Sequence, residues 1–450
     1  MNTEEFQTLS LSKEMLLNLN KIGYSSMTAV QEQSLPHILD NKDIIAQAKT
    51  GSGKTAAFGI GVLSKLNVKN FKPQTLILCP TRELAEQVSQ ELRTIAKFTQ
   101  NIKILTLCGG VAFGPQLGSL RHGAHIVIGT PGRVLKHLNK NSLQLNNITS
   151  FVLDEADRML DMGFIEDIQE IRSHLPSAHQ TLLFSATFDD EILTLSKSIQ
   201  NNAIHIKTLE MQTKNKVLQE FYKTTNKRQT ILDIFCTYQP KNCIVFCNTK
   251  VEVDQLTQNL QKNNIDALSL HGDMEQYDRN DVLVQFTNAS CCVLVATDVA
   301  ARGLDIKELA MVINYDLPHS YETYTHRIGR TARAGAEGIA CNLFEDEIEE
   351  FLDEESTIKE TSSLKHDENF KMVPQNITLV IEGGKKDKLR AGDILGTLTA
   401  TKTLHGSNIG KIDIYDRQSY VAISYDFIDE AKKILSKNTI KKKRFSVWIL

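Results

Sequence analysis

Residues 48–55 read Ala48-Lys49-Thr50-Gly51-Ser52-Gly53-Lys54-Thr55 and fit the pattern of a phosphate-binding loop (P-loop). The two glycines let the backbone curl so that its N–H groups face phosphate oxygens. In this pattern the lysine reaches the β and γ phosphates, and the threonine hydroxyl contacts Mg²⁺. The helix expected after the loop adds the positive end of its dipole. The stretch therefore predicts a site for the phosphates of a nucleotide.

A second motif, Asp154-Glu155-Ala156-Asp157, follows about 100 residues later. The apolar run 151–153 predicts a strand that delivers Asp154 to its carboxyl end, where a carboxylate that holds Mg²⁺ is needed. Glu155 is placed to accept a proton from an attacking water. The alternative is an ordinary first helical turn, in which acidic residues are favoured by the helix dipole. Because the phosphate loop lies in the same chain, we interpret the two motifs as the site of a nucleoside triphosphate hydrolase.

Outside these motifs the sequence alternates short apolar runs with longer helix-like stretches. Apolar strands separated by helices predict parallel sheets that are covered on both faces. Each run is followed by a polar or glycine-containing segment, which belongs at a ligand-facing edge of the sheet. The runs of a first series include Thr75–Cys79, His125–Ile128, Phe151–Leu153 and Thr181–Phe184, and a second series holds Cys243–Phe246, Cys291–Val295 and Ala310–Ile313.

These patterns predict two tandem α/β domains followed by a small α+β domain. The expected bounds are 1–206 for the first domain, 207–216 for a connector, 217–360 for the second domain, 361–373 for a linker and 374–450 for the third. In the third domain, strand-like segments alternate with helix-like stretches at Ala391–Thr399 and Ile428–Ser436. This βαββαβ order is typical of the RNA-recognition fold.

Charge is distributed unevenly along the chain. Residues 1–370 carry 36 Lys and Arg against 46 Asp and Glu, a net charge of −10, whereas residues 371–450 carry 15 against 8, a net charge of +7. A basic module of this kind suggests a polyanionic partner, although a basic surface can also serve solubility alone.

The sequence favours a cytoplasmic protein. It has no apolar run long enough for a membrane span and no signal-peptide layout at its start. The eight cysteines form no CxxC pair, which predicts buried free thiols in a reducing cytoplasm.

Three arginines recur at every third position in the stretch 326–335 (HRIGRTARAG): Arg327, Arg330 and Arg333. On a helix or tight turn they would lie along one side. A solvated basic face is one interpretation. The other is an arginine finger that reaches the γ phosphate from another domain and makes hydrolysis depend on domain closure.

With these motifs in this order, roughly residues 6–345 resemble a DEAD-box RNA helicase with two RecA-like domains. The resemblance implies an RNA-stimulated ATP hydrolase that uses ATP and Mg²⁺. It assigns ATP binding to Phe6, Tyr24, Thr28 and Gln31 around the adenine, to residues Ala48, Lys49, Thr50, Gly51, Ser52, Gly53, Lys54 and Thr55 around the phosphates, and to Asp305 at the ribose. It assigns catalysis to Lys54, Asp154, Glu155, Arg330 and Arg333, Mg²⁺ binding to Thr55 and Asp154, and coupling to Asp157, Ser185, Thr187 and His326.

RNA contacts follow from the same resemblance. In the first domain they are assigned to Pro80, Thr81, Arg82, Gly110, Thr130 and Arg133, and in the second to Gln276, Arg279 and Thr297. Helix starts, glycine turns and arginines suit the sugar–phosphate backbone, which predicts little base preference. In the third domain Gln418 stands where an exposed aromatic is expected, so we expect basic residues to bind RNA: Lys385, Lys386, Lys388, Arg390, Lys411, Lys441, Lys442, Lys443 and Arg444.

The stretches Leu389–Gly396 and Ile409–Ile412 resemble the C-terminal domain of the DbpA group. The resemblance implies that a monomeric helicase recognises a 23S ribosomal RNA hairpin on pre-50S particles during ribosome biogenesis. Two other functions stay open: a general cold-shock RNA helicase or chaperone without a single target, and an ATP-gated RNA clamp that does not unwind. A DNA helicase fits the motifs less well.

Overall fold

The computed structural model describes residues 5–48, 51–188, 190–208, 217–301, 309–331, 338–345, 348–353, 356–400 and 403–450. Four of the predicted site residues, Lys49, Thr50, Asp305 and Arg333, lie outside these ranges. The chain separates into two compact units that divide near Met211. Within the described ranges, every helix is too short or too polar to cross a lipid bilayer.

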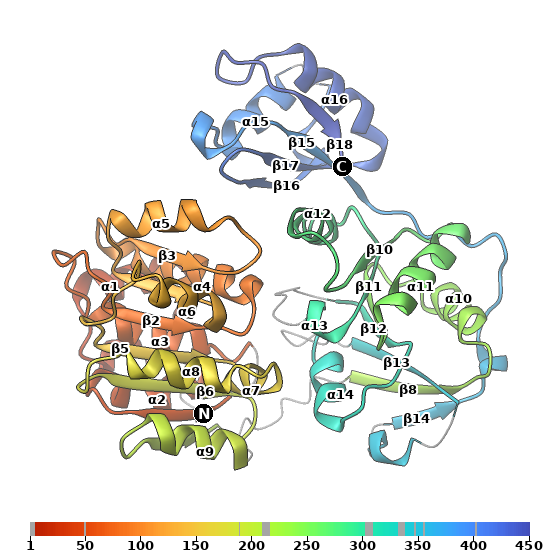
Figure 1. Ribbon diagram of the computed structural model, residues 1–450. Coiled ribbons are helices and arrows are strands. Elements are labelled where there is room, and N and C mark those ends of the chain that lie inside the picture. Colours follow the sequence, from red (N-terminus) through yellow and green to blue (C-terminus); the bar gives the residue numbers. More distant parts are fainter. Residues whose placement is uncertain are drawn as a thin grey trace. The chain divides into compact units, whose positions relative to one another are not determined.

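The first unit is built on a parallel sheet. Among its described residues, seven strands lie in the order β3-β4-β2-β5-β6-β1-β7, and helices cover both faces of the sheet (Figure 1). The strands are β1 (Ile44–Gln47), β2 (Thr75–Leu78), β3 (Ile104–Leu107), β4 (Ile126–Gly129), β5 (Ser150–Asp154), β6 (Gln180–Ser185) and β7 (Ile204–Lys207). The helices are α1 (Lys13–Lys21), α2 (Ala29–Leu39), α3 (Lys54–Ser64), α4 (Arg82–Ile95), α5 (Phe113–Arg121), α6 (Pro131–Asn139), α7 (Ala156–Asp161), α8 (Ile165–Ser173) and α9 (Asp190–Ile199).

Two separate apolar cores explain why these strands read as continuous apolar runs. Ile44 and Ala46 of β1 pack in one core, whereas Ile45 between them packs in the other. The same alternation divides Leu182 from Leu183 in β6. Because successive strand residues point to opposite faces, a sheet covered on both sides requires apolar residues at every position.

The second unit begins with a sheet of the same type. Its described strands lie in the parallel order β10-β11-β9-β12-β13-β8-β14. They are β8 (Val217–Lys223), β9 (Cys243–Phe246), β10 (Ala267–Leu270), β11 (Val293–Ala296), β12 (Met311–Asn314), β13 (Gly338–Phe344) and β14 (Ser356–Lys359). The described helices are α10 (Lys227–Tyr238), α11 (Lys250–Lys262), α12 (Gln276–Thr287), α13 (Asp298–Ala301) and α14 (Tyr321–Ile328).

A small domain follows in the same unit, and its predicted βαββαβ order is confirmed. It consists of β15 (Asn376–Ile381), α15 (Ala391–Thr399), β16 (Ile409–Ile414), β17 (Ser419–Ser424), α16 (Ile428–Lys437) and β18 (Val447–Ile449). The strands form an antiparallel sheet in the order β16-β17-β15-β18. The predicted α/β fold of two parallel-sheet domains is confirmed as well, and all eight cysteines are free and buried.

The sheet of the small domain packs on helix α12 of the preceding domain. The Tyr420 hydroxyl donates a hydrogen bond to Asp281 Oδ1 at 2.9 Å. Val284 of α12 forms an apolar cluster with Val380 and Tyr420, and Trp448 packs against it. The face on which other RNA-recognition folds stack bases is therefore occupied by protein.

The segment predicted as a linker also lies against the second parallel-sheet domain. Met372 pairs with Ile265 in an isolated bridge, and its carbonyl accepts a hydrogen bond from Asp266 N at 2.9 Å. Lys365 N donates to Thr237 Oγ1 at 2.8 Å. These contacts hold the chain between the two domains to the surface of the sheet domain.

Candidate nucleotide site and RNA-facing surfaces

The phosphate loop follows strand β1 and ends where helix α3 begins. Gly51 and Gly53 have φ values of +87° and +91°, which residues with a side chain rarely adopt. A Cβ atom on Gly53 would also lie 2.5 Å from Gln31 Nε2. The positive φ favours glycine at position 53, and an added Cβ would also displace the Gln31 amide.

Gln31 connects the start of helix α2 to this loop. Its Oε1 accepts a hydrogen bond from Thr28 N at 2.9 Å, and its Nε2 donates to the Gly53 carbonyl at 3.1 Å. The side chain is buried, and its two hydrogen bonds hold the start of α2 against the phosphate loop. One N–H and one lone pair of the amide remain for a nucleotide base.

Phe6 and Tyr24, the other predicted adenine-site residues, lie together. Their rings meet edge to face, with centroids 6.2 Å apart. The Tyr24 hydroxyl donates to Glu91 Oε1 of α4 at 3.1 Å, and burial together with that carboxylate raises the pKa of Tyr24 well above its ordinary value. Glu91 thus belongs to the site, although no sequence motif indicated it.

Lys54 and Asp154 carry the charges that a magnesium nucleotide requires. Both residues are buried, and within the described residues Lys54 Nζ and Asp154 Oδ1 have no hydrogen-bond partner. Burial raises the pKa of Asp154 to about 7, against the opposing charge of Lys54. Buried charged atoms without partners are unfavourable. A phosphate oxygen at Lys54 and Mg²⁺ at Asp154 would satisfy both, so these residues fit the cofactor, and half-buried Thr55 follows Lys54 on α3.

Glu155 adopts a strained conformation at the start of helix α7. Its φ and ψ are both 56°, in the left-handed region. A residue with a side chain is held there at a cost of about 1–3 kcal/mol, and such strain clusters at functional sites. Arg158 Nη1 lies 2.7 Å from Glu155 Oε2, and both side chains are nearly inaccessible to solvent. The ion pair fixes the orientation of the candidate base. The only signal for this pair in the sequence is the three-residue spacing between Glu155 and Arg158.

Asp157 joins the acidic motif to strand β6. Its Oδ2 accepts hydrogen bonds from Ala186 N at 2.8 Å and Thr187 N at 3.3 Å. Ser185 closes the connection, because its carbonyl accepts a hydrogen bond from Ala48 N at 2.9 Å. The predicted coupling residues of the first domain therefore form one network with the phosphate loop.

The RNA contacts predicted in the first domain follow the ends of three adjacent strands. Pro80, Gly110 and Thr130 come shortly after β2, β3 and β4, which neighbour one another in the sheet. The Thr81 hydroxyl caps helix α4 by accepting a hydrogen bond from Leu84 N at 3.3 Å. Arg82 Nη1 is buried without a hydrogen-bond partner in the described chain. Arg133 lies in the first turn of α6.

The predicted contacts of the second domain also lie at helix starts. Gln276 and Arg279 belong to the first turn of α12, and Thr297 immediately precedes α13. His326 is on α14, which ends at Ile328, so Arg330 follows the helix and is buried. Arg327 and Arg330 therefore do not share one helical face, and Arg333 lies outside the described residues.

Arg327 has a structural role. Its five N–H groups are all used: two donate to Asp298 at 2.7 Å each, and the others to Asn314 Oδ1 at 3.0 Å, the Asp316 carbonyl at 2.6 Å and Asn248 Oδ1 at 2.9 Å. The side chain is fully buried. A guanidinium with every donor satisfied inside the protein has none left for a phosphate.

Basic residues of the small domain gather on two neighbouring loops. Lys441 Nζ donates to the Lys388 carbonyl at 2.6 Å and pairs with Asp393 at 2.9 Å. Lys443 pairs with Asp387 at 3.3 Å. The loops at 385–390 and 441–444 thereby form one surface, which we call the basic loop pair. Lys411 lies on strand β16 and pairs with Asp413 at 2.8 Å.

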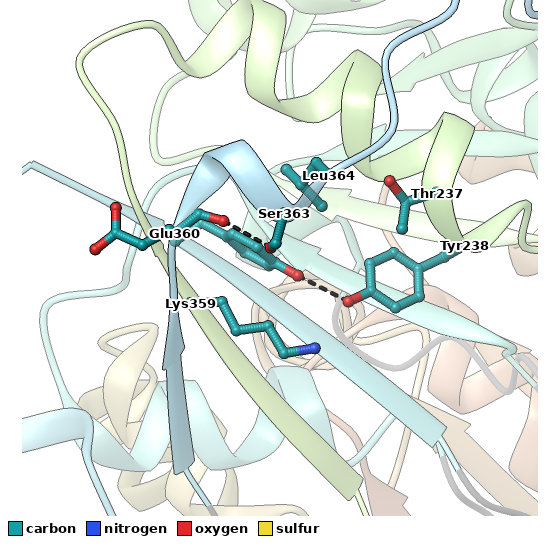
Figure 2. Close-up of a pocket in the computed structure, with 7 residues that line it drawn as sticks. Thr237, Tyr238, Lys359, Glu360, Ser363 and Leu364 are labelled. Atoms are coloured by element: carbon teal, nitrogen blue, oxygen red, sulfur yellow. Dashed lines mark hydrogen bonds between the residues drawn. The ribbon is translucent and has the colours of Figure 1, made fainter.

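A pocket of about 300 Å³ lies elsewhere in the second unit, at the end of edge strand β14 (Figure 2). Glu220 is buried beside it and accepts hydrogen bonds from Tyr222, Tyr238 and Lys359. Burial alone would raise the pKa of Glu220, but these partners lower it below its ordinary value. Because the carboxylate and the ammonium satisfy each other, we interpret the group as a clamp for strand β14.

Comparison with known proteins agrees with this geometry. Family models match at residues 28–195 (DEAD/DEAH box helicase), 226–335 (helicase conserved C-terminal domain) and 378–449 (DbpA RNA binding domain). The chain is 45% identical to the ATP-dependent RNA helicase DbpA of Escherichia coli over 99% of both chains, and 39% identical to DbpA of Bacillus subtilis over 98% of both. The chain therefore belongs to the DEAD-box ATP-dependent RNA helicases and, within them, to the DbpA group.

Solved structures show the same two-domain fold. Dbp5 of S. cerevisiae bound to RNA and ADP BeF3 is 32% identical, with a TM-score of 0.71, over 80% of this chain and 96% of that one. Mss116p bound to ssRNA and AMP-PNP is 28% identical, with a TM-score of 0.68, over 77% of this chain and 75% of that one. The protein is therefore an ATP-dependent RNA helicase, an enzyme that hydrolyses ATP.

Proposed function

We propose that this helicase unwinds short RNA duplexes in 23S ribosomal RNA during assembly of the large ribosomal subunit, as a cytoplasmic monomer acting on pre-50S particles. The basic loop pair carries the proposal. It lies on a domain whose sheet is already packed on α12, so a hairpin bound at the loops would be held close to the predicted contacts Gln276 and Arg279. The DbpA RNA binding domain model that matches residues 378–449 supports an RNA partner for this surface.

In this proposal the first domain holds the nucleotide. Lys54 binds the β and γ phosphates, and Thr55 and Asp154 hold Mg²⁺, which neutralises charge on the phosphates when bound. Glu155 accepts the proton of the attacking water, and Arg158 keeps its carboxylate in place. Gln31, Tyr24 and Phe6 receive the adenine.

Turnover also requires the second domain. Arg330 and Arg333 act as fingers at the γ phosphate, where such a contact contributes roughly 10³- to 10⁵-fold in rate. Because the fingers and the phosphate loop belong to different domains, hydrolysis requires closure. Closure also joins the two halves of the RNA track and bends the bound strand, which a regular duplex cannot follow.

The basic loop pair gives the decisive test. Replacing Lys441, Lys442, Lys443 and Arg444 with serine should abolish the preference for a 23S hairpin fragment over oligoadenylate in stimulating ATP hydrolysis, while stimulation by oligoadenylate remains. A matched control removes charge elsewhere in the same domain, at Lys432, Lys433 and Lys437. If both variants lose the preference for the 23S fragment equally, the basic loop pair has no specific role in that preference.

Two further results would select another function. If the unaltered protein shows no preference for the 23S fragment, a general RNA chaperone fits better. If it hydrolyses ATP on RNA but displaces no strand from a short duplex, an ATP-gated clamp fits better.

A further inference from the structure

The first domain contains a hydrogen-bonded cluster that the proposed function leaves without a role. It joins the end of β3, the loop after it and helices α5 and α6. Its centre is the side-chain amide of Gln116, a residue only 8% exposed. The surrounding residues include predicted RNA contacts, although Gln116 itself belongs to no motif identified in the sequence.

The contacts of Gln116 fix its orientation. Nε2 donates a hydrogen bond to the Cys108 carbonyl at 3.0 Å. Oε1 accepts one from Arg133 Nη1 at 2.8 Å and lies 3.1 Å from His137 Nε2. Both lone pairs of the oxygen are used, and only the nitrogen can donate to a carbonyl. The amide therefore has a single arrangement that satisfies all three partners.

Arg133 extends the cluster to the exposed loop after β3. Its Nη1 and Nη2 both donate to the Val111 carbonyl at 3.0 Å. Gly110, directly before Val111, has a φ of +71°, so the loop depends on a left-handed turn. In the described part of the chain no carboxylate pairs with Arg133, which leaves positive charge beside the loop. Such a surface suits a phosphate backbone.

His137 supports Gln116 from the other side. Its ring stacks on Phe113, with centroids 4.1 Å apart, and its Nδ1 lies 2.9 Å from Ser142 Oγ. Burial, together with the charges of Arg133 and two nearby lysines, lowers the pKa of His137 to about 4. The ring is therefore neutral near pH 7 and donates from Nε2 to Gln116 Oε1. The Ser142 hydroxyl lies 2.9 Å from both His137 Nδ1 and the His137 carbonyl, and its single proton can serve one of these two acceptors at a time.

We infer that Gln116 is a positioning residue for RNA binding, which fixes the Gly109–Val111 loop and the Arg133 guanidinium in the arrangement that receives the RNA backbone. The inference rests on the proposed RNA contacts at Gly110 and Arg133. A long arginine side chain loses rotamer freedom on binding, and a partner that immobilises it beforehand removes this cost from the binding step. Gln116 acts through these neighbours, since its own side chain is buried.

Gln116→Met tests the inference, because methionine keeps the length of the side chain and loses all three hydrogen bonds. The dissociation constant for fluorescein-labelled oligoadenylate should rise roughly tenfold, the effect of losing hydrogen bonds at a buried amide. The affinity for a fluorescent ADP analogue should not change. The slope of log K against log salt should also stay the same, because no charge is removed. Arg133→Met, in contrast, should reduce that slope by about 0.7 if the guanidinium also neutralises a phosphate.

A second variant and a control complete the experiment. Gln116→Glu keeps both acceptor contacts, but it sets a carboxylate oxygen against the Cys108 carbonyl and adds a negative charge beside Arg133. It should therefore lose at least as much RNA affinity as Gln116→Met and, unlike Gln116→Met, it should also reduce the salt slope. Gln90→Met makes the same change at an exposed site on α4 and should bind RNA normally. Unaltered RNA affinity in Gln116→Met overturns the inference, and so does an equal loss of RNA and ADP affinity. If the unaltered protein binds no RNA, the proposed function itself fails.

Discussion

Arg327 offers a sharp test of the difference between an arginine that supports the fold and one that reaches the nucleotide. Arg327→Met removes a buried guanidinium with five hydrogen bonds, including a two-pronged ion pair with Asp298. It also leaves the buried side-chain oxygen of Asn314 without a donor. Breaking a buried ion pair from one side costs about 3–5 kcal/mol. We therefore expect a loss of about 4 kcal/mol in the stability of the second sheet domain.

Thermal unfolding of the full chain without nucleotide measures this loss. For a domain of this size each kcal/mol shifts Tm by about 2–4 °C, so the expected shift is on the order of 10 °C. Trp448 is the single tryptophan and packs against α12 of this domain, which makes its fluorescence a direct probe. Arg327→Lys keeps the positive charge but lacks the planar guanidinium group. Its Tm should therefore lie between that of the unaltered protein and that of Arg327→Met. Arg417→Met at an exposed position serves as the control. A normal Tm with lost ATP turnover in Arg327→Met would refute the structural role.

Three further changes probe other parts of the protein. Gly53→Ala places a side chain at a left-handed φ and against Gln31, which should cost about 1–2 kcal/mol at that residue. ADP binding should weaken about tenfold in a fluorescence titration, and unchanged binding would contradict the conclusion that the loop favours glycine at position 53. Val284→Lys should shift the emission of Trp448 to longer wavelength as the small domain leaves α12, and an unmoved spectrum would disprove that packing. The lowered pKa of His137 means that the unfolded chain takes up a proton first as pH falls below about 6.5, so the first domain should lose about 1–2 kcal/mol between pH 7 and pH 5, whereas His137→Gln should show no such loss.

The apolar runs named in the sequence became the buried strands β2, β4, β5, β6, β9, β11 and β12, whereas the buried internal strands β1 and β13 were not named. The run 243–246 became β9 with the same bounds. The strands β3, β7, β8, β10 and β14 were not named either. Of these, the edge strands β7 and β14 bury little of their surface and carry no continuous apolar run. In the small domain the alternation of strand-like and helix-like segments predicted the order of the four strands and two α-helices that the structure describes there.

The sequence also predicted some features of the candidate site and missed others. The phosphate loop and the acidic motif are local, so their backbone conformation follows from a few neighbouring residues. The ion pair between Arg158 and Glu155 was not predicted, and neither were the two backbone groups that hold the Gln31 amide, the Thr28 N–H and the Gly53 carbonyl. The spacing of Arg327, Arg330 and Arg333 suggested one functional face, whereas the structure buries Arg327 in a hydrogen-bond network of its own.

The sequence by itself determined the class of fold, the ATP motifs and the basic character of the C-terminal domain, because each depends on residue types at short, fixed spacings. Only the tertiary structure decided which polar groups meet. Tyr420 and Asp281, for example, are 139 residues apart in sequence. Gln116 reaches Arg133 and His137 across two helices, and no local pattern encodes that distance. Hydrogen bonds between distant segments depend on where the apolar cores place the helices and strands, and this placement depends on the whole chain.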